Sequence, residues 1–127
     1  LYLAAIGLLY IALALWCTFD PETTSRKVGF TLNGDSGRSE FMTVYGGREF
    51  GMAVIFLMPF VRPELLTGSL LACVAIHAAL VVFRGISLVM YSDFAAFTGR
   101  LVIGEWVIFL IGLAVCFFEL RGAGTQP

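Results

Sequence analysis

Four charged side chains lie within stretches of sequence that are otherwise apolar: Arg48, Glu49, Arg84 and Glu105. An unpaired charge in the hydrocarbon core of a membrane costs about 2.5–3.5 kcal/mol, so we expect these two bases and two acids to neutralise one another. In particular, we predict that Arg84 meets Glu49 or Glu105. Three roles are compatible with such an intramembrane charge cluster: it fixes helix register, it carries protons or ions, or it lines a pocket for a polar ligand.

The only histidine, His77, lies in an apolar stretch between small and aliphatic residues. A single histidine supplies too few ligands for a structural zinc site. We interpret His77 as a packing residue that makes a hydrogen bond. Two alternatives stay open: its small neighbours leave room for a tetrapyrrole with His77 as axial ligand, or it relays protons. No cofactor is predicted, although contact with a tetrapyrrole or a quinone is compatible with the sequence.

Other catalytic patterns are missing or incomplete. The sequence contains neither a phosphate-binding glycine loop nor an HExxH zinc motif. Residues 34–37 read GDSG, a serine-protease signature, but the only histidine is in a hydrophobic stretch, so we reject a nucleophile there. The three cysteines occupy separate apolar stretches without CxxC spacing, which favours packing over metal or redox chemistry. We therefore predict no catalytic residue, no metal site and no enzyme activity, with an enzyme that acts on an apolar substrate as a third hypothesis.

The composition indicates a membrane protein. Of the 127 residues, 59% are hydrophobic and 13% are charged, and the mean hydropathy is +0.91. Soluble domains carry roughly 25% charged residues. The net charge of −1 and the single lysine argue against a nucleic-acid partner. The expected partners are membrane lipids and either other integral membrane subunits or further copies of this chain.

The apolar stretches predict four transmembrane helices, at about residues 1–19, 43–61, 65–91 and 101–119. Each has close to the 20 residues that cross a hydrocarbon core. We interpret residues 1–19 as a retained span, because this run is longer than the apolar region of a signal peptide. Residues 20–41 form a polar loop, either a short hairpin or an irregular segment. The predicted fold class is an all-α membrane protein, with residues 1–127 as one four-helix domain and both termini on the same side.

The second predicted span opens with small residues. Tyr45 is followed by Gly46 and Gly47, and Gly51 comes four residues after Gly47. A GxxxG spacing lets a neighbouring helix approach closely within a membrane. We therefore predict that this stretch is a helix-packing site.

The order of these features resembles a known family. A polar loop ending in Ser-Glu-Phe precedes the YGG of residues 45–47, Gly51 and an apolar span, and then come Arg84 in the third span and Glu105 early in the fourth. This arrangement is similar to the small four-helix membrane proteins grouped as the DUF4345 family. The resemblance implies the architecture of the chain and no particular activity.

These observations lead to a functional expectation. We expect a non-catalytic integral membrane protein, an accessory or structural subunit that packs in a larger membrane complex. The alternative is a small carrier or binder of lipid, quinone, pigment or protons that uses the charge cluster. We predict location in a bacterial inner membrane. The count of basic residues favours a cytoplasmic polar loop, with Arg26, Lys27, Arg38 and Arg100 on one side and Arg62 and Arg121 on the other.

Overall fold

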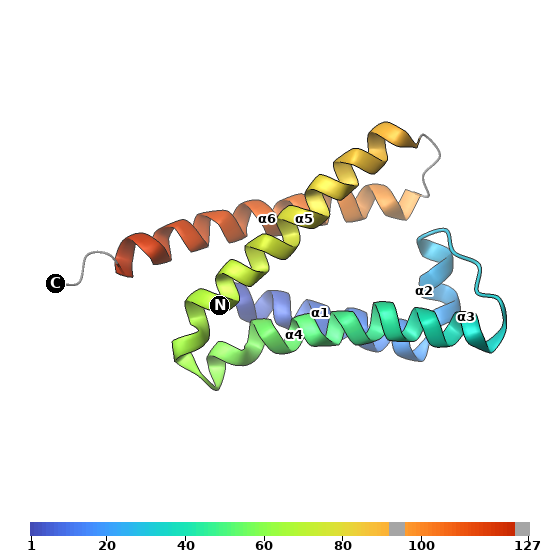
Figure 1. The fold of residues 1–127 in the computed structure, drawn as a ribbon, viewed down its shortest axis with the longest axis horizontal. Helices are drawn as coiled ribbons and strands as arrows, with labels where there is room; N and C mark the ends of the chain where they lie inside the picture. Colours follow the sequence, from blue (N-terminus) through green and yellow to red (C-terminus); the bar gives the residue numbers. More distant parts are fainter. Residues whose placement is uncertain (92–95, 124–127) are drawn as a thin grey trace.

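A computed structural model describes residues 1–91 and 96–123 of the chain. The elements in these ranges are helical. The main helices are α1 (Tyr2–Phe19), α4 (Arg48–Leu57), α5 (Leu66–Met90) and α6 (Ala96–Ala123), with two short helices, α2 (Pro21–Lys27) and α3 (Gly34–Phe41). Figure 1 shows α1 lying beside α4, and α5 crossing α6. Helix α1 begins and helix α6 ends at the same end of the molecule (Figure 1).

Three segments are long and apolar enough to cross a membrane. They are Tyr2–Phe19, Pro63–Met90 and Phe97–Gly122. They coincide with the first, third and fourth predicted spans. The all-helical fold class is therefore confirmed for the described residues, and three of the helices have the length and composition of membrane spans.

The second predicted span, residues 43–61, is helical but divided. A π-helical turn covers Met42–Gly47, the α-helix α4 has only ten residues, and a 3₁₀ turn covers Met58–Phe60. The divisions have local causes, because glycine weakens a regular helix and Pro59 lacks the N–H that would continue it. Within the described residues, this segment is not among those long and apolar enough to span, so a fourth crossing is not confirmed.

Close glycine contacts set the register between α1 and this second segment. A Cβ at Gly7 would lie 2.6 Å from the Leu57 Cγ, and a Cβ at Gly46 would lie 2.6 Å from the Thr18 Oγ1. Each pair of residue numbers adds up to 64, so the two segments run antiparallel in one register over eleven residues. The absence of side chains at these two glycines leaves the space that the Leu57 and Thr18 side chains occupy between the two segments.

The predicted polar loop 20–41 is largely helical, which corrects that prediction. The Asp20 Oδ1 accepts a hydrogen bond from the Thr23 N–H at 3.3 Å, and Pro21 occupies the first helical position of α2. Asp followed by Pro is a common helix start, because the carboxylate satisfies a free N–H and proline needs no partner. The connection between α2 and α3 contains Gly29, which has a φ of 83°, and α3 begins at Gly34, which has a φ of 62°.

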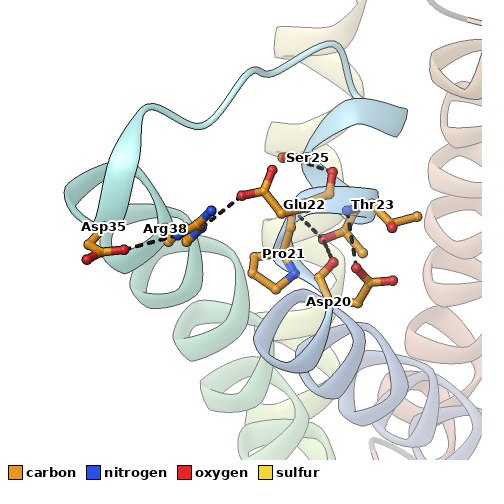
Figure 2. Close-up of polar contacts among 8 residues, drawn as sticks. Asp20, Pro21, Glu22, Thr23, Ser25, Asp35 and Arg38 are labelled. Atoms are coloured by element: carbon orange, nitrogen blue, oxygen red, sulfur yellow. Dashed lines mark hydrogen bonds and ion pairs between the residues drawn. The ribbon is translucent and has the colours of Figure 1, made fainter.

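Helices α2 and α3 are joined by one arginine. Figure 2 shows Arg38 between two acids: its Nε lies 2.8 Å from the Glu22 Oε1, and its Nη1 lies 3.0 Å from the Asp35 Oδ1. The hydrogen bond to Glu22, together with the charges of both acids, raises the pKa of Arg38 above its ordinary value. The Arg38–Glu22 ion pair connects α3 to α2 at the polar end of the molecule, and the Arg38–Asp35 pair lies within α3.

The buried core forms where α5 crosses the pair of α1 and α4. Its members come from these three helices: Leu3, Ile6, Tyr10, Ala53, Phe56, Leu70 and Cys73. Helix α6 adds little to this core. Only 11% of the most apolar stretch of α6 is buried, compared with 28% of the corresponding stretches of α1 and of α5.

Candidate functional site

The first part of the site is an ion pair between α5 and α6. The Arg84 Nε donates to the Glu105 Oε2 at 3.0 Å, and the Arg84 Nη2 donates to the Glu105 Oε1 at 2.7 Å. The two side chains are 27% and 14% exposed. This fork-to-fork geometry is the strongest form of an arginine–carboxylate contact. Of the two acids considered for Arg84, the structure therefore selects Glu105.

The other two predicted charges pair with each other. The Arg48 Nη2 lies 3.1 Å from the Glu49 Oε1, and the Arg48 guanidinium lies 5.4 Å from the centre of the Tyr45 ring. The Glu49 side chain is 13% exposed and that of Arg48 is 52% exposed. Among the described residues, no ion pair connects this pair to Arg84 or Glu105. The predicted single cluster is therefore two separate pairs, each neutral by itself.

His77 is almost completely buried, with both ring nitrogens engaged. Its Nδ1 lies 2.8 Å from the carbonyl oxygen of Cys73, and its Nε2 lies 3.0 Å from the Tyr10 hydroxyl. A carbonyl only accepts, so in the neutral ring the Nδ1–H donates and the Nε2 accepts from Tyr10. The Phe56 ring packs against the Tyr10 ring edge-on at 5.6 Å. As folded, His77 has no free nitrogen for a metal or a tetrapyrrole, and its contacts are those of a hydrogen-bonded packing residue.

Tyr2 extends this buried polar network along α1. Its hydroxyl donates to the carbonyl oxygen of Ile108 in α6 at 2.8 Å and lies 3.5 Å from the Cys73 Sγ. Neither Tyr2 nor Tyr10 was among the predicted site residues. A signal was available, because tyrosines eight residues apart share a helix face, as do Cys73 and His77 four residues apart.

The buried polar groups of the chain are satisfied from within. The Ser69 hydroxyl, for example, donates to the carbonyl oxygen of Ile55 at 2.8 Å and so connects α5 to the second segment. Within residues 1–91 and 96–123, no buried side-chain nitrogen or oxygen lacks a partner, and no three His, Cys, Asp or Glu side chains are grouped as metal ligands. This part of the chain therefore presents no orphaned polar group that points to a bound ligand.

A cavity of about 300 Å³ lies at the end of the molecule where α1 begins. Its lining is mainly apolar and includes Tyr2, Pro59, Phe60 and Leu70, with Glu119 as the charged member. The cavity is separate from the ion pair of Arg84 and from the ring of His77. Tyr2 connects it to the buried network.

The glycines of the predicted packing site have different environments. Gly46 is buried against α1, and Tyr45 stacks on the Phe41 ring at 4.5 Å. Gly47 and Gly51 are exposed, and among the described residues nothing lies within 4 Å of a Cβ built on either. The GxxxG pair therefore does not pack against another helix of this chain, and Gly46 is the residue that does.

Comparisons with known proteins returned no relative. The chain matches no protein-family model, no curated protein and no solved structure. The resemblance to the DUF4345 family stays a prediction, as does any function.

Proposed function

We propose that this chain is a non-catalytic integral membrane protein that acts as an accessory subunit by packing against helices of a larger membrane complex. The charge pairs support a structural role, because Glu49 and Glu105 each have a base of their own at 2.7–3.1 Å. A carrier that works through one shared charge cluster has less support, since the two pairs are not joined by an ion pair among the described residues.

The proposal includes a fourth crossing. Residues 42–60 lie antiparallel to α1 in one register, from the contact of Gly46 with Thr18 to that of Gly7 with Leu57. Their 19 residues extend about 28 Å at a rise of 1.5 Å per residue, close to the thickness of a hydrocarbon core. We therefore include residues 42–60 in the proposal as a fourth crossing beside α1.

The observation that carries the proposal is the exposed face of α4 around Gly47 and Gly51. Its other members recur at helical spacing and are 41–45% exposed: Val44, Val54, Ile55 and Met58. A GxxxG pair allows close contact between helix backbones in lipid, and no helix of the described chain uses it. We infer that a helix of another subunit occupies this face.

The proposal is tested by replacing the small residue at the centre of that face. We expect Gly51→Leu to separate the chain from its assembly, measured as a smaller particle by native mass spectrometry after extraction in mild detergent. Gly85→Leu is the matched control, because Gly85 is also exposed and has no neighbour within 4 Å. If the wild-type chain is a single copy without a second polypeptide, or if both variants assemble like the wild type, the proposal is wrong.

The orientation and location are also part of the proposal. Arg26, Lys27 and Arg38 lie in or beside α2 and α3, and Arg100 lies in the first turns of α6. Arg62 and Arg121 belong to the opposite end. The excess of basic residues favours placing the α2–α3 end in the cytoplasm of a bacterial cell. Cysteine labelling from either side of the inner membrane, at Ser36→Cys in α3, checks this assignment.

A further inference from the structure

Four side chains of α1 and α5 form one continuous line of hydrogen-bonding groups. The Tyr10 hydroxyl lies 3.0 Å from the His77 Nε2, the His77 Nδ1 lies 3.7 Å from the Cys73 Sγ, and the Cys73 Sγ lies 3.5 Å from the Tyr2 hydroxyl. Tyr10, Cys73 and His77 are at most 6% exposed, and Tyr2 is partly buried. Each can both accept and release a proton.

The donors along this line point in one direction. The Tyr2 hydroxyl donates its hydrogen bond to the carbonyl oxygen of Ile108. The Tyr2 oxygen can therefore accept a hydrogen bond from the Cys73 thiol. The His77 Nδ1–H points to the carbonyl oxygen and the sulfur of Cys73. In this neutral ring the Nε2 has no proton, so it accepts a hydrogen bond from the Tyr10 hydroxyl. The order of donation is therefore Tyr10, His77, Cys73, Tyr2.

We propose that this line is a proton relay through the interior of the bundle, from Tyr10 to Tyr2. A proton arrives at the Tyr10 oxygen while the Tyr10 hydroxyl proton passes to the His77 Nε2. The His77 Nδ1 proton passes to the Cys73 sulfur, whose own proton passes to the Tyr2 oxygen. The Tyr2 hydroxyl turns from the Ile108 carbonyl oxygen and releases its own proton into the cavity that Tyr2 lines. Each group gains one proton and loses one, so the net charge of the line is unchanged and no co-reactant is required. The groups then turn back to their first orientation.

One end of the line opens onto a cavity. Tyr2 lines the cavity of about 300 Å³ that also contains Glu119. Tyr2 and Tyr10 are eight residues apart, which is about 12 Å along the helix. The line therefore leads from the interior beside Tyr10 to the cavity that Tyr2 lines.

The relay is independent of the proposed packing role. The docking face is the outer surface of α4 around Gly47 and Gly51, whereas the relay uses inward side chains of α1 and α5. If Gly51→Leu abolishes assembly, the relay stays intact. A chain without any partner subunit would still conduct protons.

The test measures proton entry into liposomes that contain the full chain. Vesicles of phosphatidylcholine and phosphatidylglycerol enclose the pH-sensitive dye pyranine, and valinomycin with a potassium gradient makes the interior negative. We expect wild-type vesicles to acidify faster than protein-free vesicles. Tyr10→Phe removes one hydroxyl from the line and should lower the rate to that of protein-free vesicles. The matched control Tyr91→Phe, at an exposed tyrosine beyond the end of α5, should keep the wild-type rate.

A second pair of variants keeps the test decisive if Tyr10→Phe does not fold, as judged by circular dichroism and gel filtration. Cys73→Ser retains a hydroxyl that accepts and donates a proton, so vesicles with this variant should acidify at the wild-type rate. Cys73→Ala retains no such group, and its vesicles should acidify at the rate of protein-free vesicles. A wild-type rate equal to that of protein-free vesicles overturns the relay, as does a wild-type rate in folded Tyr10→Phe or folded Cys73→Ala.

Discussion

The two helix pairs of this protein are stabilised in different ways. Helix α1 and the segment 42–60 approach closely at Gly7 and Gly46, and they contribute most of the buried apolar core. Helices α5 and α6 cross each other and share the ion pair of Arg84 with Glu105. They leave large apolar side chains exposed along much of their length, such as Phe83, Val89, Ile103 and Phe118.

This difference shows how a membrane bundle can combine close packing with polar contacts. The hydrophobic effect does not drive helices together in lipid, so either small residues or polar groups must supply the association. The first pair uses small residues. The second pair uses a salt bridge, and hydrogen bonds from Tyr2, Tyr10 and Ser69 connect it to the first.

The largest expected effect comes from removing the Phe56 ring, which lies in the core of the first helix pair. Phe56 is fully buried, and Phe56→Ala should lower the free energy of unfolding by about 3–5 kcal/mol, because it leaves a cavity in the core. Phe83→Ala, at a side chain that is 72% exposed on α5, is the control and should have little effect. Steric-trap unfolding in bicelles measures both. Equal losses would show that the core is not concentrated in the first pair.

The next largest effect is expected at the ion pair between the helices of the second pair. Glu105→Gln leaves the Arg84 charge without its partner, and we expect a loss of about 2–3 kcal/mol in the same unfolding measurement, since an unpaired charge is costly at membrane depth. The double variant Arg84→Met with Glu105→Leu removes both charges and should recover most of that loss. Unchanged stability in Glu105→Gln would mean that the ion pair does not hold α5 to α6.

A smaller effect is expected at the glycine that brings α1 close to the second segment. A side chain at Gly46 would enter the space occupied by the Thr18 Oγ1. Gly46→Leu should therefore cost about 1–3 kcal/mol through overpacking. Gly47→Leu adds the same side chain one residue later, where nothing lies within 4 Å, and the isolated chain should keep its stability. A comparison of the two melting temperatures in detergent gives the result.

The smallest expected effect concerns the contact between the polar end and the second pair. The Lys27 Nζ lies 5.5 Å from the Trp16 ring and 5.6 Å from the Phe97 ring, which places the cation between α1 and α6. Lys27→Met should cost about 0.5–1 kcal/mol. Hydrogen exchange at the first described turns of α6 should become faster, while exchange in α4 stays the same. If Lys27→Met changes the hydrogen-exchange rate of α4 and α6 by the same amount, Lys27 does not have this role.

Parts of the fold and of the site followed from local sequence signals. Three predicted spans coincide with helices long and apolar enough to cross, because runs of about 20 apolar residues have few other stable states. The loop prediction for residues 20–41 was wrong, because Asp20-Pro21 not only ends α1 but also begins α2. The glycine stretch does approach α1 closely, but the contact is made by Gly46 rather than by the GxxxG pair.

The sequence by itself determined that this chain builds apolar helices and that the charges within them need opposite charges nearby. Both conclusions follow from the cost of exposing polar groups to hydrocarbon. Only the tertiary structure decided which partners meet. Glu49 and Glu105 are equivalent in sequence as partners of Arg84, and Tyr10 is 67 residues from His77. Such contacts depend on how α5 crosses the other helices, and that crossing is set by packing summed over whole helix faces rather than by any local pattern.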